Sequence, residues 1–160
     1  MVHIRDPRSV LLSWVHNLDR LHPHNAPHHL LYVCPTPPKQ YFDLSFSQKV
    51  DWNIEYFLPN VLSWTKRWVE IYDAGHHNIL LTTFSDIVSN EDGFLFRILN
   101  FYGISRERFS RPVIESDDLH FRVGREDEWR DCFTSIQLAQ IRAMIDGPLT
   151  ERFGWPLERW

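Results

Sequence analysis

The chain has 160 residues, of which 43% are hydrophobic and 14% aromatic, enough for one domain with a buried core and too apolar for disorder. A formal net charge of −4 argues against a nucleic-acid binder that works through bulk positive charge, so any anion site must be local. No apolar run is long enough to span a membrane, and no signal-peptide pattern is found at the N-terminus. The widely separated Cys34 and Cys132 favour a reducing compartment, with a single disulfide as the alternative. We therefore expect a cytoplasmic protein without a nucleic-acid partner and with no membrane segment in this chain.

The chain opens with a strand that runs into a capped helix. Residues 2–4 are predicted to end a short strand. Asp6 is predicted to cap the helix, because its carboxylate can accept from the free N–H groups of the first turn. Pro7 suits the first helical position, where its missing N–H costs nothing, and apolar spacing continues the helix to about Leu21.

Arg5 lies at this strand–helix junction and is a candidate anion ligand. The helix start carries partial positive charge, and an arginine holds phosphate through its planar fork. Ser13 follows Asp6 by seven residues, a rise of roughly 10 Å, so a phosphate touching Ser13 and Arg5 would lie beside the helix flank. The alternative is that Arg5 pairs with Asp6 or a nearby acid, and that Ser13 only fills space.

Residues 22–47 are predicted to form a long, mostly irregular loop region, because prolines recur there. Such loops inside compact domains are often functional. Histidines in this loop raise the possibility of a metal, but Pro27 opposes the helical spacing that a ligand pair would need, so no metal is predicted. The four histidines are His22, His24, His28 and His29.

The middle of the chain is predicted to be helical, with one buried strand. A helix opens at Ser47 or Asp51 and reaches Ala74, with Pro59 either kinking it or dividing it in two, and Gly75 capping its end. Residues 79–84 form a strand whose apolar start is typical of a parallel sheet covered on both sides.

Two further helices follow. Ser89 or Asn90 caps the first, which Gly103 ends. The second opens at the capping box of residues 134–137, runs to about Ile145 and is stopped by the pair at 147–148. Two or three strands with about five helices indicate the α/β class. Because two parallel strands do not form a stable sheet alone, we expect partner strands from another chain or from a larger domain.

A second anion-binding candidate lies late in the chain. Arg122 and Arg125 flank Gly124, which permits a close approach of the backbone to a ligand. A basic loop with a central glycine can surround a phosphate with N–H groups and guanidinium together. The alternative is a solvated loop, in which the acidic residues 126–128 neutralise both arginines.

In this order, these segments resemble the sulfotransferases that use 3′-phosphoadenosine 5′-phosphosulfate (PAPS). The family's R-[DN]-P-[RK]-[DS]-x-x-x-S segment is similar to residues 5–13. Its later R-K-G-x-x-G-[DE]-W segment is similar to residues 122–129, and the h-F-T-x-x-Q that follows is similar to residues 133–137. Between them, its tryptophan-bearing helix, the strand ending in Y-E-D-L and the helix ending in F-L-G resemble residues 64–68, 80–87 and 101–103.

The resemblance implies a partial P-loop-type three-layer fold, with a short parallel sheet flanked by helices, that binds PAPS or its product PAP without a metal. Arg5 and Ser13 would hold the 3′-phosphate from one side, Arg122 and the backbone at Gly124 from the other, and Phe84 would lie near the adenine. The sequence departs from the family at Phe84, which lacks a tyrosine hydroxyl, at Val123, where the family has lysine, and at Asp127, where it has a second glycine. The implied cofactor-binding residues are Arg5, Ser13, Phe84, Arg122, Val123 and Gly124.

The family places its phosphosulfate-binding lysine loop and its usual catalytic base ahead of the first matched segment. We therefore expect residues 1–160 to be a single partial domain, the C-terminal part of a sulfotransferase domain, which is inactive alone and is completed by an N-terminal chain. The intact domain would transfer a sulfuryl group from PAPS to a hydroxyl or amine of a small-molecule or glycan acceptor. The catalytic residues stay unassigned. The alternative is a degenerate, non-enzymatic remnant or interaction module that binds at most a 3′-phosphoadenosine nucleotide.

Overall fold

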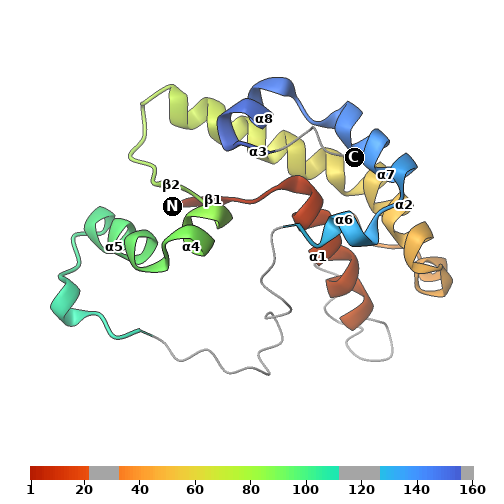
Figure 1. The fold of residues 1–160 in the computed structure, drawn as a ribbon, viewed down its shortest axis with the longest axis horizontal. Coiled ribbons are helices and arrows are strands. Elements are labelled where there is room, and N and C mark those ends of the chain that lie inside the picture. Colours follow the sequence, from red (N-terminus) through yellow and green to blue (C-terminus); the bar gives the residue numbers. More distant parts are fainter. Residues whose placement is uncertain (22–32, 112–126, 156–160) are drawn as a thin grey trace.

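The computed structural model describes residues 1–21, 33–111 and 127–155. Within them the fold is mixed α/β and mostly helical, with one sheet of two parallel strands (Figure 1). Strand β1 (Val2–Ile4) pairs with β2 (Leu81–Thr83), and Val2 lies opposite Leu81. The predicted first strand and the predicted parallel pairing are confirmed. The three-layer P-loop-type arrangement and the single partial domain stay predictions.

Helix α1 (Pro7–Arg20) begins as its sequence predicts. The Asp6 side chain accepts from the backbone N–H of Arg8, and Pro7 occupies the first turn. Its apolar face, which includes Leu11 and Val15, is fully buried. Strand β1 is therefore followed, after only Arg5 and Asp6, by a capped helix whose apolar face is buried.

The irregular region is shorter than predicted. Residues 33–38 have no regular structure, but a 3₁₀ helix, η2, follows at Lys39–Asp43, and residues 22–32 with their four histidines lie outside the described residues. Helix α2 (Phe46–Tyr56) starts before Ser47, because the Ser45 hydroxyl accepts from the N–H of Gln48 and the Gln48 side chain accepts from the N–H of Ser45.

Pro59 divides the long helical region into two helices. Helix α3 (Leu58–Asp73) carries Pro59 in its first turn, where proline is tolerated, and Gly75 follows its end with a positive φ of 66°. Of the two predicted outcomes at Pro59, a kink or a division, the structure has the division.

The second strand ends earlier than predicted. Helix α4 (Phe84–Ser89) begins at Phe84, because Thr83 and Asp86 satisfy each other's backbone N–H groups as a capping box. Helix α5 (Glu91–Phe101) follows, capped by Asn90, the second of the two predicted caps. The 3₁₀ helix η3 (Arg106–Arg108) ends this part of the chain.

Three short helices complete the described fold: α6 (Trp129–Cys132), α7 (Ser135–Met144) and α8 (Gly147–Phe153). The predicted capping box of Thr134 and Gln137 is present. Helix α7 ends near Ile145, ahead of Gly147 and Pro148, as predicted. The same two residues also open α8, since proline is well suited to a first turn.

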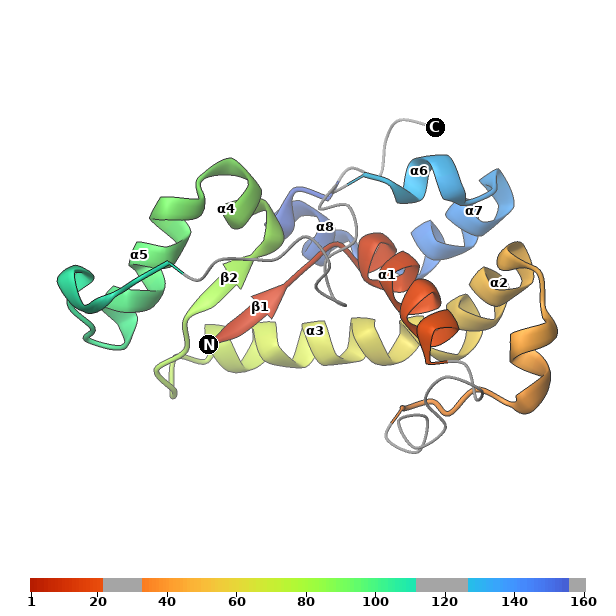
Figure 2. The ribbon, with the colours of Figure 1, turned by 90° about the horizontal axis from the view of Figure 1, so that it is seen from below.

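A shared core joins these elements around β1. Val2 and Ile4 are buried in one cluster with side chains from α1, α2, α3 and the three C-terminal helices. Gln137 ties α7 to α2, because its buried Nε2 donates to the carbonyl of Ser47 and to the Asp51 carboxylate at 2.7 Å. In Figure 2, α3 runs along one side of the two strands, and α4 lies on the other.

Over the part of the chain that the structure describes, no helix combines the length and apolar character needed to cross a membrane. Both cysteines are free thiols, with Cys34 exposed and Cys132 half-buried, so the disulfide alternative is not formed.

Candidate anion-binding site

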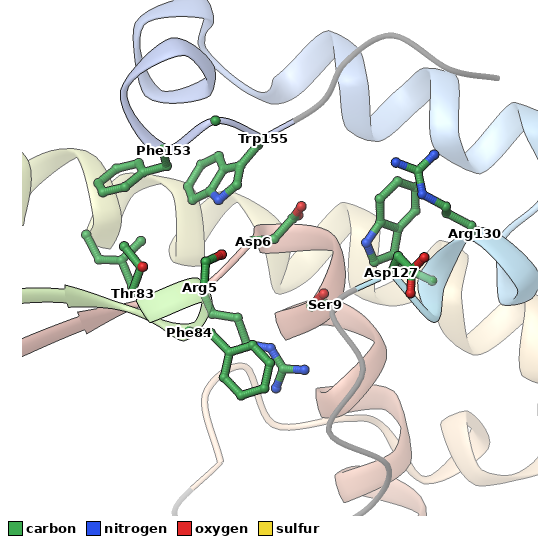
Figure 3. A pocket seen from close by; sticks show the side chains of 13 residues that line it. Arg5, Asp6, Ser9, Thr83, Phe84, Asp127, Arg130, Phe153 and Trp155 are labelled. Carbon is green, nitrogen blue, oxygen red and sulfur yellow. The ribbon is translucent and has the colours of Figure 1, made fainter. Parts of the chain in front are cut away.

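A pocket of about 190 Å³ lies where both strands end (Figure 3). Its walls come from four places: the β1–α1 junction, the start of α4, the segment that opens α6 and the end of α8. In α/β proteins, ligands bind at the carboxyl ends of parallel strands. The pocket therefore occupies the edge of the sheet where a ligand is expected.

Two of the predicted site residues meet in this pocket. The guanidinium of Arg5 lies over the ring of Phe84, with Cζ 4.2 Å from the ring centroid. The two residues are 79 positions apart in sequence, and the parallel pairing of Ile4 with Thr83 places each directly after the end of its strand. An aromatic face stabilises a cation while leaving its N–H edge for an anion.

Asp6 pairs with Arg8. Its carboxylate accepts from Nη2 of Arg8 at 2.6 Å and from Nε at 2.9 Å, in addition to the capping bond. The alternative in which this carboxylate pairs with Arg5 is therefore not realised. The first helical turn carries the Arg8 side chain back over its own cap, whereas Arg5 precedes the helix and extends toward Phe84.

Trp129, the first residue of α6, packs against Arg8 in the first turn of α1. This indole is 1% exposed and carries the guanidinium of Arg8 at 4.1 Å and that of Arg130 at 4.5 Å from its ring centroid. Trp129 ends the segment that resembles the family's second motif. Arg122, Val123 and Gly124, the other predicted residues of that segment, lie outside the described residues.

Ser9, not Ser13, lines the pocket. Ser9 is buried, and it lies four residues after Arg5 on the same helix face as Ser13. Ser13 lies one turn further along α1, is half-buried and is not among the pocket's lining residues. Ser9 was not predicted, although its four-residue spacing from Ser13 could have indicated it. Arg130 was not predicted either, and its adjacency to Trp129 is the only signal for it.

The charges of the pocket walls are mixed. Arg5 and Arg130 bring positive charge, while Asp6 and Asp127 bring negative charge, and Asp6 already pairs with Arg8. Asp127 stands where the family has its second glycine and lies across the pocket from Arg5 (Figure 3). Because whole-ligand pockets measure roughly 300–1,000 Å³, the volume suits a phosphate with part of its nucleotide.

His3 lies beside the site on β1. Its Nδ1 is 3.0 Å from the hydroxyl oxygen of Thr82, and its ring meets Phe94 of α5 edge-on. Burial lowers the pKa of His3 below its ordinary value of 6.5, Asp86 opposes this shift and Arg5 adds to it. The neutral form of His3 is therefore favoured next to Arg5, the predicted phosphate-binding residue.

We expect His3→Gln to reduce the loss of stability in mild acid. Since the folded pKa of His3 is lowered, the unfolded chain takes up its proton first as the pH falls through 6.5, and acid favours unfolding. Urea unfolding at pH 7.5 and pH 5.5 measures the effect. The wild type should lose more stability between these two values than the variant does, and His76→Gln, at an exposed position between α3 and β2, serves as the control. An unchanged pH dependence in His3→Gln would contradict the assignment.

No group of three or more histidine, cysteine, aspartate or glutamate residues suited to a metal occurs within residues 1–21, 33–111 and 127–155. Besides the carboxylates of Asp6 and Asp127, the pocket presents guanidinium groups, hydroxyls and a helix start, which suit an anion.

Fold and site together define an α/β protein with a candidate anion-binding pocket at the carboxyl ends of its parallel strands. The sulfotransferase domain family matches residues 1–116 of this chain, which therefore belongs to that family. No curated protein and no solved structure gives a significant match. The family match includes Arg5, Ser13 and Phe84 and ends before Arg122.

Proposed function

We propose that this chain supplies the 3′-phosphate-binding half of a PAPS-dependent sulfotransferase. The intact domain would transfer the sulfuryl group of PAPS to a hydroxyl or amine of a small-molecule or glycan acceptor. The observation that carries the proposal is the stacking of Arg5 on Phe84 at the ends of two parallel strands, inside the region that matches the family.

The pocket residues suit the nucleotide half of this cofactor. The N–H edge of Arg5 would donate to the 3′-phosphate, and the Ser9 and Ser13 hydroxyls lie on the flank of α1 where a phosphate would rest. The Phe84 ring would contact the adenine. Arg122, Val123 and the backbone of Gly124 would close on the phosphate from the second segment. Trp129, which follows that segment in the sequence, contacts Arg8 of α1.

We assign no catalytic residue among the 160. When bound, PAPS supplies the activated sulfuryl group, and the family's lysine loop stabilises charge on the bridging oxygen. We propose that an N-terminal complementing segment brings this loop and the base, and that the described half contributes affinity and orientation. The chain alone would then bind nucleotide without turnover.

A second candidate function is a non-enzymatic remnant that retains weak nucleotide binding. Asp127 favours it, because its carboxylate lines the pocket and would repel a phosphate. Val123 favours it too, since valine lacks the charge of the family's lysine. The two candidates differ in whether a complementing segment restores sulfuryl transfer.

Calorimetric titration of the 160-residue chain with 3′,5′-ADP, 5′-AMP and adenosine tests the binding proposal. We expect 3′,5′-ADP to bind about tenfold more tightly than 5′-AMP, which corresponds to roughly 1.4 kcal/mol from the 3′-phosphate. The preference should shrink at high salt, since it rests on charge. Equal affinities for the two nucleotides would overturn the 3′-phosphate site. Turnover of PAPS by the chain alone would overturn its proposed dependence on a complementing segment.

A further inference from the structure

Arg8 lies between the two segments that form the candidate site, yet it is nearly inaccessible. The residue is 2% exposed, and its Nε and Nη2 donate to the Asp6 carboxylate. The flat face of the same guanidinium lies on the indole of Trp129. One side chain thus contacts the cap of α1 through its edge and the first residue of α6 through its face.

The helix that Trp129 opens is too short to hold its own place. Helix α6 has four residues, and an isolated turn of helix is not stable, because nucleation costs more than its few hydrogen bonds return. Its position must come from packing, and Trp129, at 1% exposure, is its buried residue. The segment that leads into α6 carries Asp127, which lines the pocket.

We propose that Arg8 and Trp129 are positioning residues that couple the two sides of the anion site. The inference rests on the proposed nucleotide-binding function. The guanidinium is held in one orientation by the Asp6 carboxylate, and it in turn holds Trp129, together with its neighbours Asp127 and Arg130, against the start of α1. Arg5 and Arg130, which line the same pocket, can then contact one ligand together.

Lysine cannot take this role. A lysine ammonium keeps the charge, but it has no planar fork for a bidentate carboxylate and no flat face to lie on an indole. Arg8→Lys therefore separates geometry from charge. Trp129→Phe is the corresponding change on the other side, because it keeps an aromatic face while reducing the contact area. Both substitutions are mild enough that the fold should survive, which circular dichroism would verify.

The test is a double-mutant cycle of Arg8→Lys and Trp129→Phe, read as the affinity for 3′,5′-ADP and for 5′-AMP by calorimetry. Each single variant should lose about 3–10-fold in affinity for 3′,5′-ADP and less for 5′-AMP, and the double variant should lose no more than the worse single one, since coupled contacts are not additive. If the fold-loss in affinity of the double variant equals the product of the two single fold-losses, the two residues act independently and the proposal is overturned.

Hydrogen exchange gives a readout that does not depend on nucleotide binding. The amides of Arg130 and Phe133 donate to the carbonyls of Asp127 and Trp129, so they report whether α6 is held in place. Arg8→Lys should speed their exchange while leaving the α5 amides unchanged. Unchanged exchange at Arg130 and Phe133 would overturn the coupling even if the nucleotide binds. If Arg8→Lys speeds the exchange of these amides but the wild type does not prefer 3′,5′-ADP over 5′-AMP, the coupling holds and the proposed nucleotide-binding function is wrong.

Arg106→Lys is the matched control. The Arg106 guanidinium also lies on an aromatic ring, 3.7 Å from the centroid of Phe96, but it is in η3 and does not line the pocket. This variant should change neither the nucleotide affinities nor the exchange of α6. If it reproduced the effects of Arg8→Lys, the loss would be a general result of weakening an arginine–aromatic contact and would overturn a specific role for Arg8.

Discussion

Replacing Asp6 with alanine is expected to lower the free energy of unfolding by about 3–5 kcal/mol, because it leaves the buried cation of Arg8 without its carboxylate partner. The Asp6 and Arg8 side chains are only 15% and 2% exposed, so water does not replace the lost contact. Loss of the helix cap adds about 1 kcal/mol. Urea unfolding followed by circular dichroism measures the change.

Two variants separate the causes. Asp6→Asn keeps a capping side chain but removes the charge, so most of the loss should remain. Asp73→Ala breaks a bidentate pair with Arg152 at 2.7 and 2.8 Å, but that pair is exposed, and about 0–1 kcal/mol is expected. If Asp6→Ala cost no more than Asp73→Ala, the buried pair would not stabilise the helix start as argued.

Arg5→Ala is expected to weaken 3′,5′-ADP binding roughly 10–100-fold, because hydrogen bonds to charged groups contribute about 1.5–3 kcal/mol. Arg5→Lys should lie between this variant and the wild type, since it keeps the charge and loses the planar fork. Affinity for 5′-AMP should change less, because that nucleotide lacks the 3′-phosphate. Calorimetric titration of each variant gives the comparison.

Arg106→Ala serves as the control for Arg5→Ala, because both remove a guanidinium that lies on a phenylalanine ring. It should leave both nucleotide affinities unchanged. Phe84→Leu should weaken both 3′,5′-ADP and 5′-AMP, since an adenine contact is common to both, and should weaken 3′,5′-ADP more, because Arg5 also loses the ring on which it lies. If the Arg5→Ala variant bound 3′,5′-ADP as tightly as the wild type does, Arg5 would not bind the 3′-phosphate.

Helix starts were the most predictable part of this chain. Asp6 and the box of Thr134 and Gln137 were read correctly, because a cap and its partners lie within three residues in sequence. The boxes at Ser45 and Thr83 have the same local pattern and were overlooked, which moved the start of α2 and the end of β2. In both boxes the signal is local and present in the sequence.

Contacts between distant segments were predicted only in part. Arg5 was a candidate from its place at the strand–helix junction and Phe84 from the family resemblance, whereas their contact with each other appeared only in the structure. Local spacing left open which side chain Asp6 would bind, and the answer, Arg8, depends on side-chain directions in the first turn. The sequence marks Ser9 and Arg130 as pocket residues only weakly, through the spacing of Ser9 from Ser13 and the adjacency of Arg130 to Trp129.

Most helix starts, the α/β class and the family can be predicted from short motifs and their order along the chain. The packed fold alone sets the register of β1 with β2, the burial of Arg8 between Asp6 and Trp129, and the convergence of four segments on one pocket. These features depend on which apolar surfaces are buried against one another, because side chains far apart in sequence meet only after the helices have packed.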